Sequence, residues 1–233
     1  MVFNKNSRIM VVVAHPDDET LGCGGTIIKA REAGARVAVL FLGEGVSARF
    51  TPNEYETEAF KEQTTIRQNG AKNALKILGI DNLEFGDRLC TQFDTYPLLD
   101  FVKTIERHIA VFKPNIIFTH GESEVNIDHK ITHKAVEVAC RPIGEVNKIA
   151  VYSIEIICSG SFKFNDVFKP NVYVDVEQYW NQKMKAWRCY AGESREFPFP
   201  RSEEGLKVLA NYRGIQSGTK LAEGFKLERM LLT

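Results

Sequence analysis

Ile9-Met-Val-Val-Val-Ala-His-Pro-Asp-Asp-Glu19 is the stretch that decides the fold of this 233-residue chain. It opens with a run of apolar residues, most of them β-branched, which predicts a short, buried strand of a parallel sheet. One imidazole and three carboxylates follow at the strand's carboxyl end, where open α/β sheets place their ligand crevices. Pro16 restrains the backbone of His15, which suits a site whose ligands are held still. His15 with Asp17 or Asp18 supplies the nitrogen and oxygen ligands that zinc accepts.

The composition is that of an ordinary soluble globular protein, and it limits the functions open to the chain. The 30 basic and 30 acidic residues give zero net charge, so the chain lacks the excess of positive charge that favours binding to nucleic acid or an anionic membrane. No apolar run approaches the roughly 20 residues that span a bilayer. The five cysteines are far apart and form no CxxC pair, which predicts reduced thiols. We therefore expect a single domain over residues 1–233, cytoplasmic and without membrane insertion.

Apolar runs alternate with amphipathic segments along the whole chain. Strands are expected at 9–13, 36–42, 83–85, 115–119, 149–157 and 171–176, and residues 222–232 are expected to form a short strand or an irregular tail. Helices are expected at 20–34, 54–78, 97–112, 128–140, 177–190 and 203–216. Glycines at 22, 24 and 25 are expected to let the chain turn sharply and pack closely. The alternation predicts an α/β fold with a Rossmann-like, mostly parallel sheet and helices on both faces.

A second polar cluster, Asn126-Ile-Asp-His-Lys-Ile-Thr-His133, follows the strand that ends near His120. His129 and His133 are four residues apart and share a helix face, so both could bind a metal, or one could be a ligand while the other packs or caps. Asp128 is expected to cap the helix. Because the carboxyl ends of parallel strands share one edge of the sheet, His120 and His129 should lie near the first cluster.

The chain resembles the PIG-L/LmbE-like family of metal-dependent N-deacetylases. The resemblance is carried by AHPDDE at 14–19, IDH at 127–129 and AEGF at 222–225. It implies zinc, or another divalent metal such as Fe²⁺, and removal of an N-acetyl group from an amino sugar or sugar conjugate. The partner it implies is a small amino-sugar substrate. Since the family includes oligomers, the resemblance leaves a homo-oligomer open.

The resemblance also implies roles for individual residues. By motif position, the metal ligands are His15, Asp18 and His129, and Asp17 is the general base. Much of the family has a histidine where this chain has Asn126. Asparagine can donate a hydrogen bond to an oxyanion but cannot shuttle a proton. His120 is therefore our candidate for the acid.

Further residues near the predicted strand ends are expected to contact or support the substrate. Arg49 matches a family position that touches substrate, and guanidinium groups suit phosphate or hydroxyl-rich sugars. Asp87 and Arg88 leave a predicted strand at the same edge and are expected to shape the sugar pocket. Glu19 either orients the ligands or begins the helix. The loop 193–202 either covers the site or forms a subunit contact.

Other functions are compatible with parts of this pattern. The same fold could hydrolyse another acyl amide, or act on a nucleotide- or lipid-linked sugar. Gly22-Cys-Gly-Gly25 superficially resembles a phosphate-binding turn of a nucleotide-binding module. That segment lacks GxGxxG spacing, however, and the preceding carboxylates would repel a pyrophosphate. A non-catalytic sugar-binding protein is disfavoured because His15, Asp17, Asp18 and His129 are all present.

Overall fold

The fold is built on one seven-stranded sheet, seen in a computed structural model that describes residues 2–143 and 148–232. The strand order is β3-β2-β1-β4-β5-β7-β6. The first five strands in this order run parallel, whereas β7 is antiparallel to both of its neighbours. The strands are β1 (Arg8–Val13), β2 (Arg36–Gly43), β3 (Asn82–Arg88), β4 (Ile116–His120), β5 (Ala150–Ile154), β6 (Val172–Asp175) and β7 (Ala222–Arg229). The predicted mostly parallel α/β fold is confirmed, and segment 222–232 forms a strand over most of its length.

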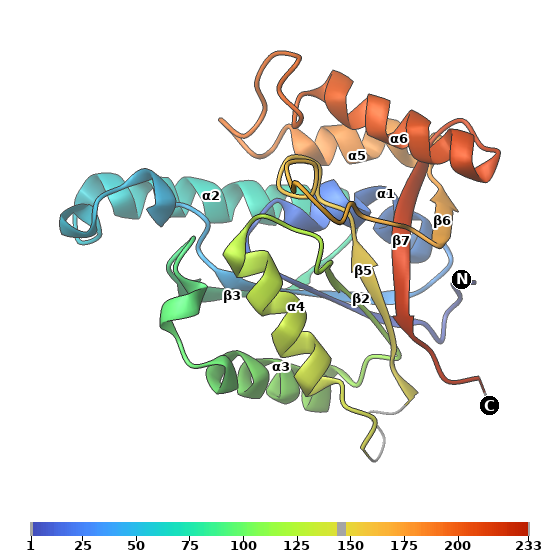
Figure 1. Cartoon of the computed structure of the whole chain (residues 1–233), viewed down its shortest axis with the longest axis horizontal. Helices are drawn as coiled ribbons and strands as arrows, with labels where there is room; N and C mark the ends of the chain where they lie inside the picture. Colours follow the sequence, from blue (N-terminus) through green and yellow to red (C-terminus); the bar gives the residue numbers. More distant parts are fainter. Residues whose placement is uncertain (1, 144–147, 233) are drawn as a thin grey trace.

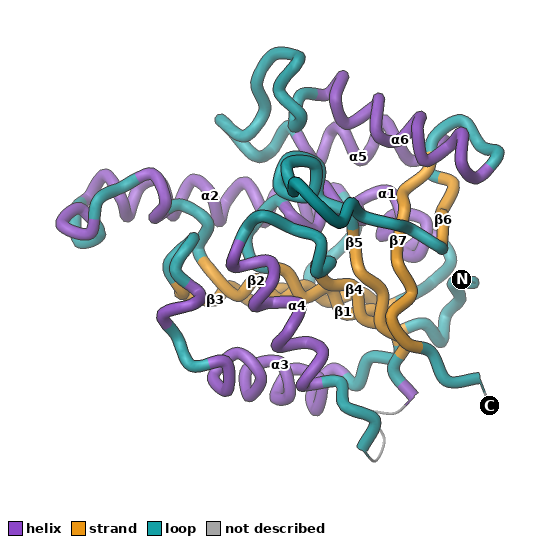
Figure 2. Tube along the Cα trace, viewed as in Figure 1, coloured by secondary structure: helices purple, strands orange, loops and turns teal. Residues whose placement is uncertain are grey.

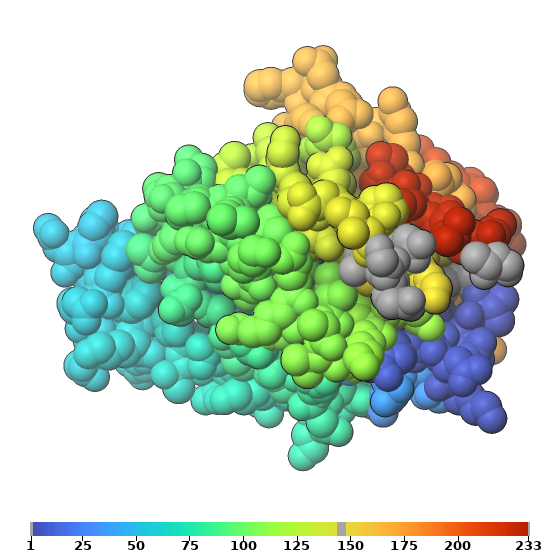
Figure 3. All heavy atoms as spheres, turned by 90° about the horizontal axis from the view of Figure 1, so that it is seen from below, coloured from blue at the N-terminus to red at the C-terminus, as the bar shows by residue number. Residues whose placement is uncertain are grey.

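Helices cover both faces of the sheet (Figures 1 and 2). Helices α3 and α4 lie on one face, and the other four lie on the opposite face. The view from below in Figure 3 shows the green and yellow-green segments that include α3 and α4. The helices are α1 (Asp18–Glu32), α2 (Glu58–Ile77), α3 (Leu98–Phe112), α4 (Ile127–Ala139), α5 (Trp180–Trp187) and α6 (Glu203–Ser217).

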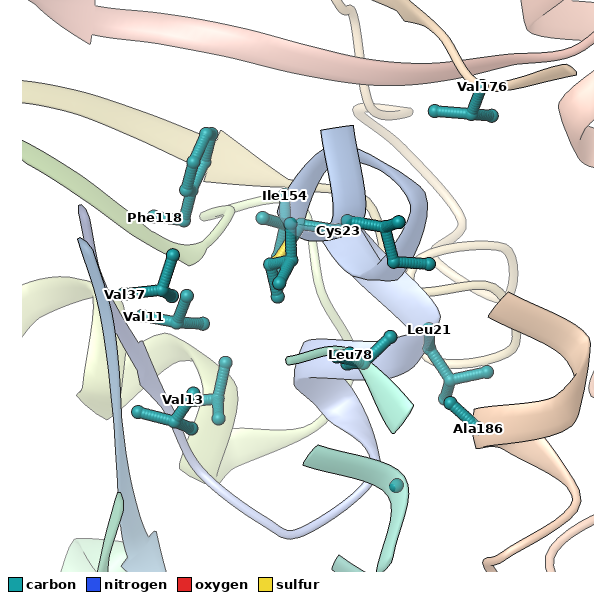
Figure 4. Packing of buried hydrophobic residues seen from close by; sticks show 14 of the residues in the cluster. Val11, Val13, Leu21, Cys23, Val37, Leu78, Phe118, Ile154, Val176 and Ala186 are labelled. Carbon is teal, nitrogen blue, oxygen red and sulfur yellow. The ribbon is translucent and has the colours of Figure 1, made fainter. Parts of the chain in front are cut away.

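Strand β1 lies in the interior of the sheet, and its apolar sequence allows both of its faces to be buried. Its side chains alternate between the two cores, with Ile9, Val11 and Val13 in one and Met10 and Val12 in the other. Because both faces are covered, a continuous apolar run is needed rather than an alternation of apolar and polar residues. Figure 4 shows Val11 and Val13 in the first of these cores, together with side chains from β2, β4, β5 and α1.

Helix α1 follows the first polar cluster and lies unusually close to the sheet. A Cβ atom on Gly22 would come within 2.6 Å of the Ile154 side chain, and one on Gly25 within 2.8 Å of Val176. The predicted close packing is therefore confirmed, but these glycines form no sharp turn. They lie inside the helix, which is broken only by the non-helical backbone of Cys23 (φ −149°, ψ 18°).

The strand order reverses between β1 and β4, because β1 leads to β2 on one side while β4 leads to β5 on the other. The loops that leave β1 and β4 therefore part in opposite directions and open a crevice at their carboxyl ends. Both polar clusters of the sequence lie at this point.

Candidate metal centre and catalytic cleft

Three side chains from the two clusters converge beyond the ends of β1 and β4. His15, Asp18 and His129 place one ligand atom each within 4.8 Å of one another, and all three residues are buried. The Asp18 Oδ2 atom is 3.7 Å from His15 Nδ1 and 3.5 Å from His129 Nε2. Ligands at ~2.1 Å from a tetrahedral zinc lie roughly 3.4 Å apart, so this spacing suits a metal ion. Burial acts to raise the pKa of Asp18, but the surrounding imidazoles lower it below its ordinary value.

The outer nitrogen of each histidine is held by a carboxylate. His15 Nε2 is 2.8 Å from Asp128 Oδ2, and His129 Nδ1 is 3.2 Å from Glu124 Oε2. This arrangement orients each imidazole so that its other nitrogen faces the cluster, as metal-binding histidines require. The donor set of one carboxylate oxygen and two imidazole nitrogens, each imidazole backed by a carboxylate, fits a catalytic divalent cation.

Asp128 does not cap α4, contrary to our expectation. Asn126 is the cap, and its side-chain oxygen accepts a hydrogen bond from the Asp128 backbone N–H at 2.9 Å. Asp128 is fully buried, and its carboxylate also accepts hydrogen bonds from the backbone N–H groups of Thr91 and Phe93. The sequence reasoning missed this role because Asp128 and Asn126 are both good caps, and only the tertiary structure distinguishes them.

Asp17 lies beside the three candidate ligands in a backbone conformation that is rare for a residue with a side chain. Its φ is 124°. The buried Glu19 accepts a hydrogen bond from the Asp17 N–H at 3.1 Å and another from the Tyr190 hydroxyl at 2.5 Å. Glu19 therefore does more than begin a helix, because it supports the strained backbone that aims Asp17. Burial raises the pKa of Asp17 to about 7, although Arg67 beside it favours the charged form.

A buried arginine that sequence reasoning did not single out holds the Asp17 carboxylate, and a buried glutamate holds that arginine in turn. Arg67 on α2 contacts Asp17 Oδ2 at 2.9 Å through Nη2, and its Nη1 contacts Glu193. Glu193 also binds Arg49, and Arg201 lies 3.4 Å from Asp17 and 3.3 Å from Glu193. We call these five residues the cleft network. The loop 193–202 thus reaches the site, in agreement with the alternative that it covers the site.

His120 and His133 lie outside the three-residue cluster. His120 is fully buried and its ring stacks on that of His129 at 3.8 Å between centroids. Its Nε2 accepts a hydrogen bond from the Ala14 N–H at 3.0 Å, so that lone pair is not free for a metal. Burial lowers the pKa of His120 below its ordinary value. His133 Nδ1 is 2.9 Å from the His120 carbonyl, which is a packing role.

A cleft of about 230 Å³ opens above the cluster. Its lining includes the three candidate ligands, the cleft network and Asn126. Asp87 and Arg88 are not part of this lining, contrary to our expectation. Strand β3 continues through both residues at the edge of the sheet, Asp87 is exposed, and Arg88 lies 4.3 Å over the Phe101 ring of α3.

A second buried ion pair packs against α1 around the kink at Cys23. Lys183 Nζ on α5 is 2.7 Å from Glu223 Oε1 on β7. Glu223 accepts hydrogen bonds from the backbone N–H groups of Gly25 and Thr26, each at 2.8 Å, and Lys183 donates one to the Leu21 carbonyl at 2.8 Å. The pair therefore satisfies the backbone groups that the kink leaves unpaired. This explains why the AEGF segment carries a glutamate.

Comparison with known proteins agrees with this geometry. Residues 10–140, more than half of the chain, match the PIG-L family model, described as GlcNAc-PI de-N-acetylase. The chain belongs to the PIG-L family. It is 27% identical, over 96% of its length and 84% of the relative's, to diacetylchitobiose deacetylase of Thermococcus kodakarensis. The predicted family is thereby confirmed.

Solved structures share the fold of this PIG-L protein. N,N'-diacetylchitobiose deacetylase of Pyrococcus horikoshii superposes with a TM-score of 0.75 at 20% identity, covering 96% of this chain and 84% of that one. GalB, the 4-carboxy-2-hydroxymuconate hydratase of Pseudomonas putida KT2440, superposes with a TM-score of 0.74 at 22% identity, covering 97% and 98%. One fold thus serves two reactions, so the site must decide the chemistry. None of the described helices is long and apolar enough to cross a membrane.

Proposed function

We propose that this protein is a hydrolase that removes the N-acetyl group of an amino sugar or sugar conjugate and releases acetate and a free amine. The observation that carries the proposal is the placement of Asp17. Its carboxylate lies beside a cluster that fits a divalent cation, and it is aimed there by Arg67 and by the support of Glu19. A carboxylate in that position can act on water next to a polarised amide.

We assign the metal to His15, Asp18 and His129, and we propose zinc, or Fe²⁺ as the alternative. A divalent cation at this position would polarise the acetyl carbonyl and lower the pKa of a water molecule that it binds. The proposal is supported by the N₂O donor set and by the carboxylates of Asp128 and Glu124 behind the two histidines.

The residues of the chain would act as follows. Asp17 accepts a proton from water as the water oxygen bonds to the acetyl carbon. The Asn126 amide, whose oxygen is engaged in capping α4, donates through its nitrogen to the developing oxyanion. The carbon–nitrogen bond then breaks, and the proton held by Asp17 passes to the leaving amine. Protonation at Asp17 replaces the acid that the missing histidine would supply.

We revise the role of His120 accordingly. It is fully buried and lies against His129 and Asp18, with its Nε2 3.3 Å from Asp18 Oδ2. We propose that it positions these two ligands rather than acting as the acid. Arg49 lines the cleft, and we retain it as a substrate contact. We no longer propose this for Asp87 and Arg88.

The test is acetate release by protein reconstituted with zinc or Fe²⁺, against a panel of N-acetylated sugars and conjugates. In Asp17→Asn we expect kcat to fall by about 10²–10⁴-fold because the proton acceptor is lost. Metal content, measured by elemental analysis, should stay at the wild-type level. Asp87→Asn, at an exposed position outside the cleft, is the matched control and should be as active as wild type. Full activity in Asp17→Asn would contradict the mechanism.

A further inference from the structure

In the cleft network, which lines the same cleft as the candidate metal ligands, the arginines outnumber the carboxylates. Among the described residues of the cleft network, three guanidinium groups meet two carboxylates, those of Asp17 and Glu193. The three arginines differ in how they are held. Arg67 is buried, with 7% of its side chain exposed, and each of its terminal nitrogens contacts a carboxylate. Both terminal nitrogens of Arg67 are therefore engaged by carboxylates, although its buried Nε has no hydrogen-bond partner within the described chain.

Arg201 is held much more weakly by the same carboxylates. Its Nη1 lies 3.4 Å from Asp17 and 3.3 Å from Glu193, and both distances are long for an ion pair between charged groups. Its Nε atom is buried and has no hydrogen-bond partner within the described chain. A quarter of its side chain is exposed in the cleft. Arg201 is thus incompletely paired inside the protein, and part of its side chain is accessible from the cleft.

Aromatic packing adds to these long carboxylate contacts in holding the Arg201 guanidinium. Arg201 lies 5.4 Å from the centroid of the Phe199 ring, and Arg195 lies 4.9 Å from it. Arg49 approaches from the loop after β2, with 48% of its side chain exposed and one terminal nitrogen bound to Glu193. A guanidinium that is ordered, incompletely paired and accessible is suited to bind an anion in a planar, two-point contact.

We propose that Arg201, with Arg49 beside it, makes the enzyme selective for amino-sugar substrates that carry an anionic group, phosphate or carboxylate, next to the N-acetylated sugar. This inference rests on the proposed deacetylase function and adds the substrate class. The anionic group completes the pairing of Arg201, and the acetamide then faces the candidate metal ligands across the cleft.

The test compares three substrates that share the N-acetylated sugar and differ in the group at C1, which is neutral in the first and anionic in the others: the methyl glycoside of N-acetylglucosamine, N-acetylglucosamine 1-phosphate, and a carboxymethyl glycoside. We expect kcat/KM to be roughly tenfold higher or more for at least one anionic substrate, the scale of one hydrogen bond to a charged group. The two anionic arms distinguish phosphate from carboxylate. In Arg201→Gln the ratio of anionic to neutral kcat/KM should fall to near one. Arg201→Lys, which keeps the charge, should retain part of the ratio.

A binding measurement separates this inference from the proposed function. Glucosamine 1-phosphate and methyl glucosaminide have no acetyl group, so calorimetry reports their affinity whether or not the protein is a deacetylase. We expect the phosphate to bind more tightly to wild type, and Arg201→Gln to remove the difference. If kcat/KM for the neutral substrate equals that for the anionic substrates, the anion preference is wrong, whereas the proposed deacetylase function is unaffected. A preference that persists in Arg201→Gln would overturn its assignment to Arg201. Acetate release from no substrate, with metal bound, would instead count against the proposed function.

Discussion

Two buried ion-pair systems support helix α1, one at its kink and one at its start, and they combine similar side chains for different purposes. At the kink, Lys183 and Glu223 are almost fully buried, and the backbone of the helix uses their remaining hydrogen-bonding capacity. At the start of α1, Arg67 and Glu193 are also buried, but their network includes Asp17 and lines the cleft. The polar groups of the first system contact only other protein groups. The second system includes Asp17, the residue proposed to act on water, and is open to the cleft.

The difference separates stability from function. A buried ion pair whose hydrogen-bonding groups are all bound within the protein cannot contact substrate. Its loss should therefore lower mainly the free energy of unfolding. A network that ends in a cleft holds one carboxylate in place, so its loss should appear mainly in turnover. Variants of the two systems can therefore test whether this division is real.

The largest effect is expected for Lys183→Met. It leaves Glu223 buried without its cation, and we expect the free energy of unfolding to fall by about 3–5 kcal/mol. Urea denaturation followed by tryptophan fluorescence measures this change, because Trp180 and Trp187 lie on the same helix. Lys185→Met is the matched control, since Lys185 is exposed two residues away. Equal stability of the two variants would show that the pair does not support the kink.

An intermediate effect is expected for Arg67→Met. Asp17 would keep only its long contact with Arg201, so we expect kcat for acetate release to fall by about 10²-fold through misplacement of the base. The free energy of unfolding should fall by less than in Lys183→Met, because Glu193 retains Arg49 and Arg201. Arg67→Lys keeps the charge without the two-point contact and should recover part of kcat. If Arg67→Met loses stability but no turnover per folded molecule, the division between the two systems fails.

The smallest effect is expected where the cleft network reaches solvent. A double-mutant cycle between Arg49 and Glu193 should give a coupling energy of about 0.2–1 kcal/mol, because Arg49 is half exposed and water screens the pair. The coupling should weaken further in high salt. The same cycle between Lys183 and Glu223 should give a larger value that changes little with salt. Thermal unfolding of the variants measures both cycles, and equal salt dependence would contradict the comparison.

Strand topology was sufficient to predict that the two polar clusters meet, because β1 and β4 are parallel neighbours and both clusters follow their carboxyl ends. The choice of Asp18 rather than Asp17, and of His129 rather than His133, as candidate ligands came from the family resemblance. Segments that end at the same sheet edge are predictable in this way because the geometry of parallel strands leaves little choice.

The two ion-pair systems were not predicted, although the position of each basic residue in the sequence could have indicated them. Arg67 lies on the buried stripe of α2 with Gly70, Ala71, Ala74 and Leu75, and Lys183 lies on that of α5. A basic residue on an apolar helix face must have a buried partner. The sequence does not say which one, because Glu193 and Glu223 lie far along the chain. Asp87 and Arg88 were misplaced for another reason, since the strand continues three residues beyond its expected carboxyl end and removes them from the loop.

The position of β7 has a consequence for how the protein is made. This strand lies between β5 and β6, so β6 cannot join the sheet before residues 222–229 have been synthesised. Glu223 must also travel from a point 198 residues away to reach the Gly25 N–H. A nascent chain on the ribosome therefore carries His15 and Asp18 long before the residues that support the helix behind them have been synthesised. Any product that stops before residue 222 would keep the three candidate ligands and lack that support, which makes it a candidate for aggregation and degradation.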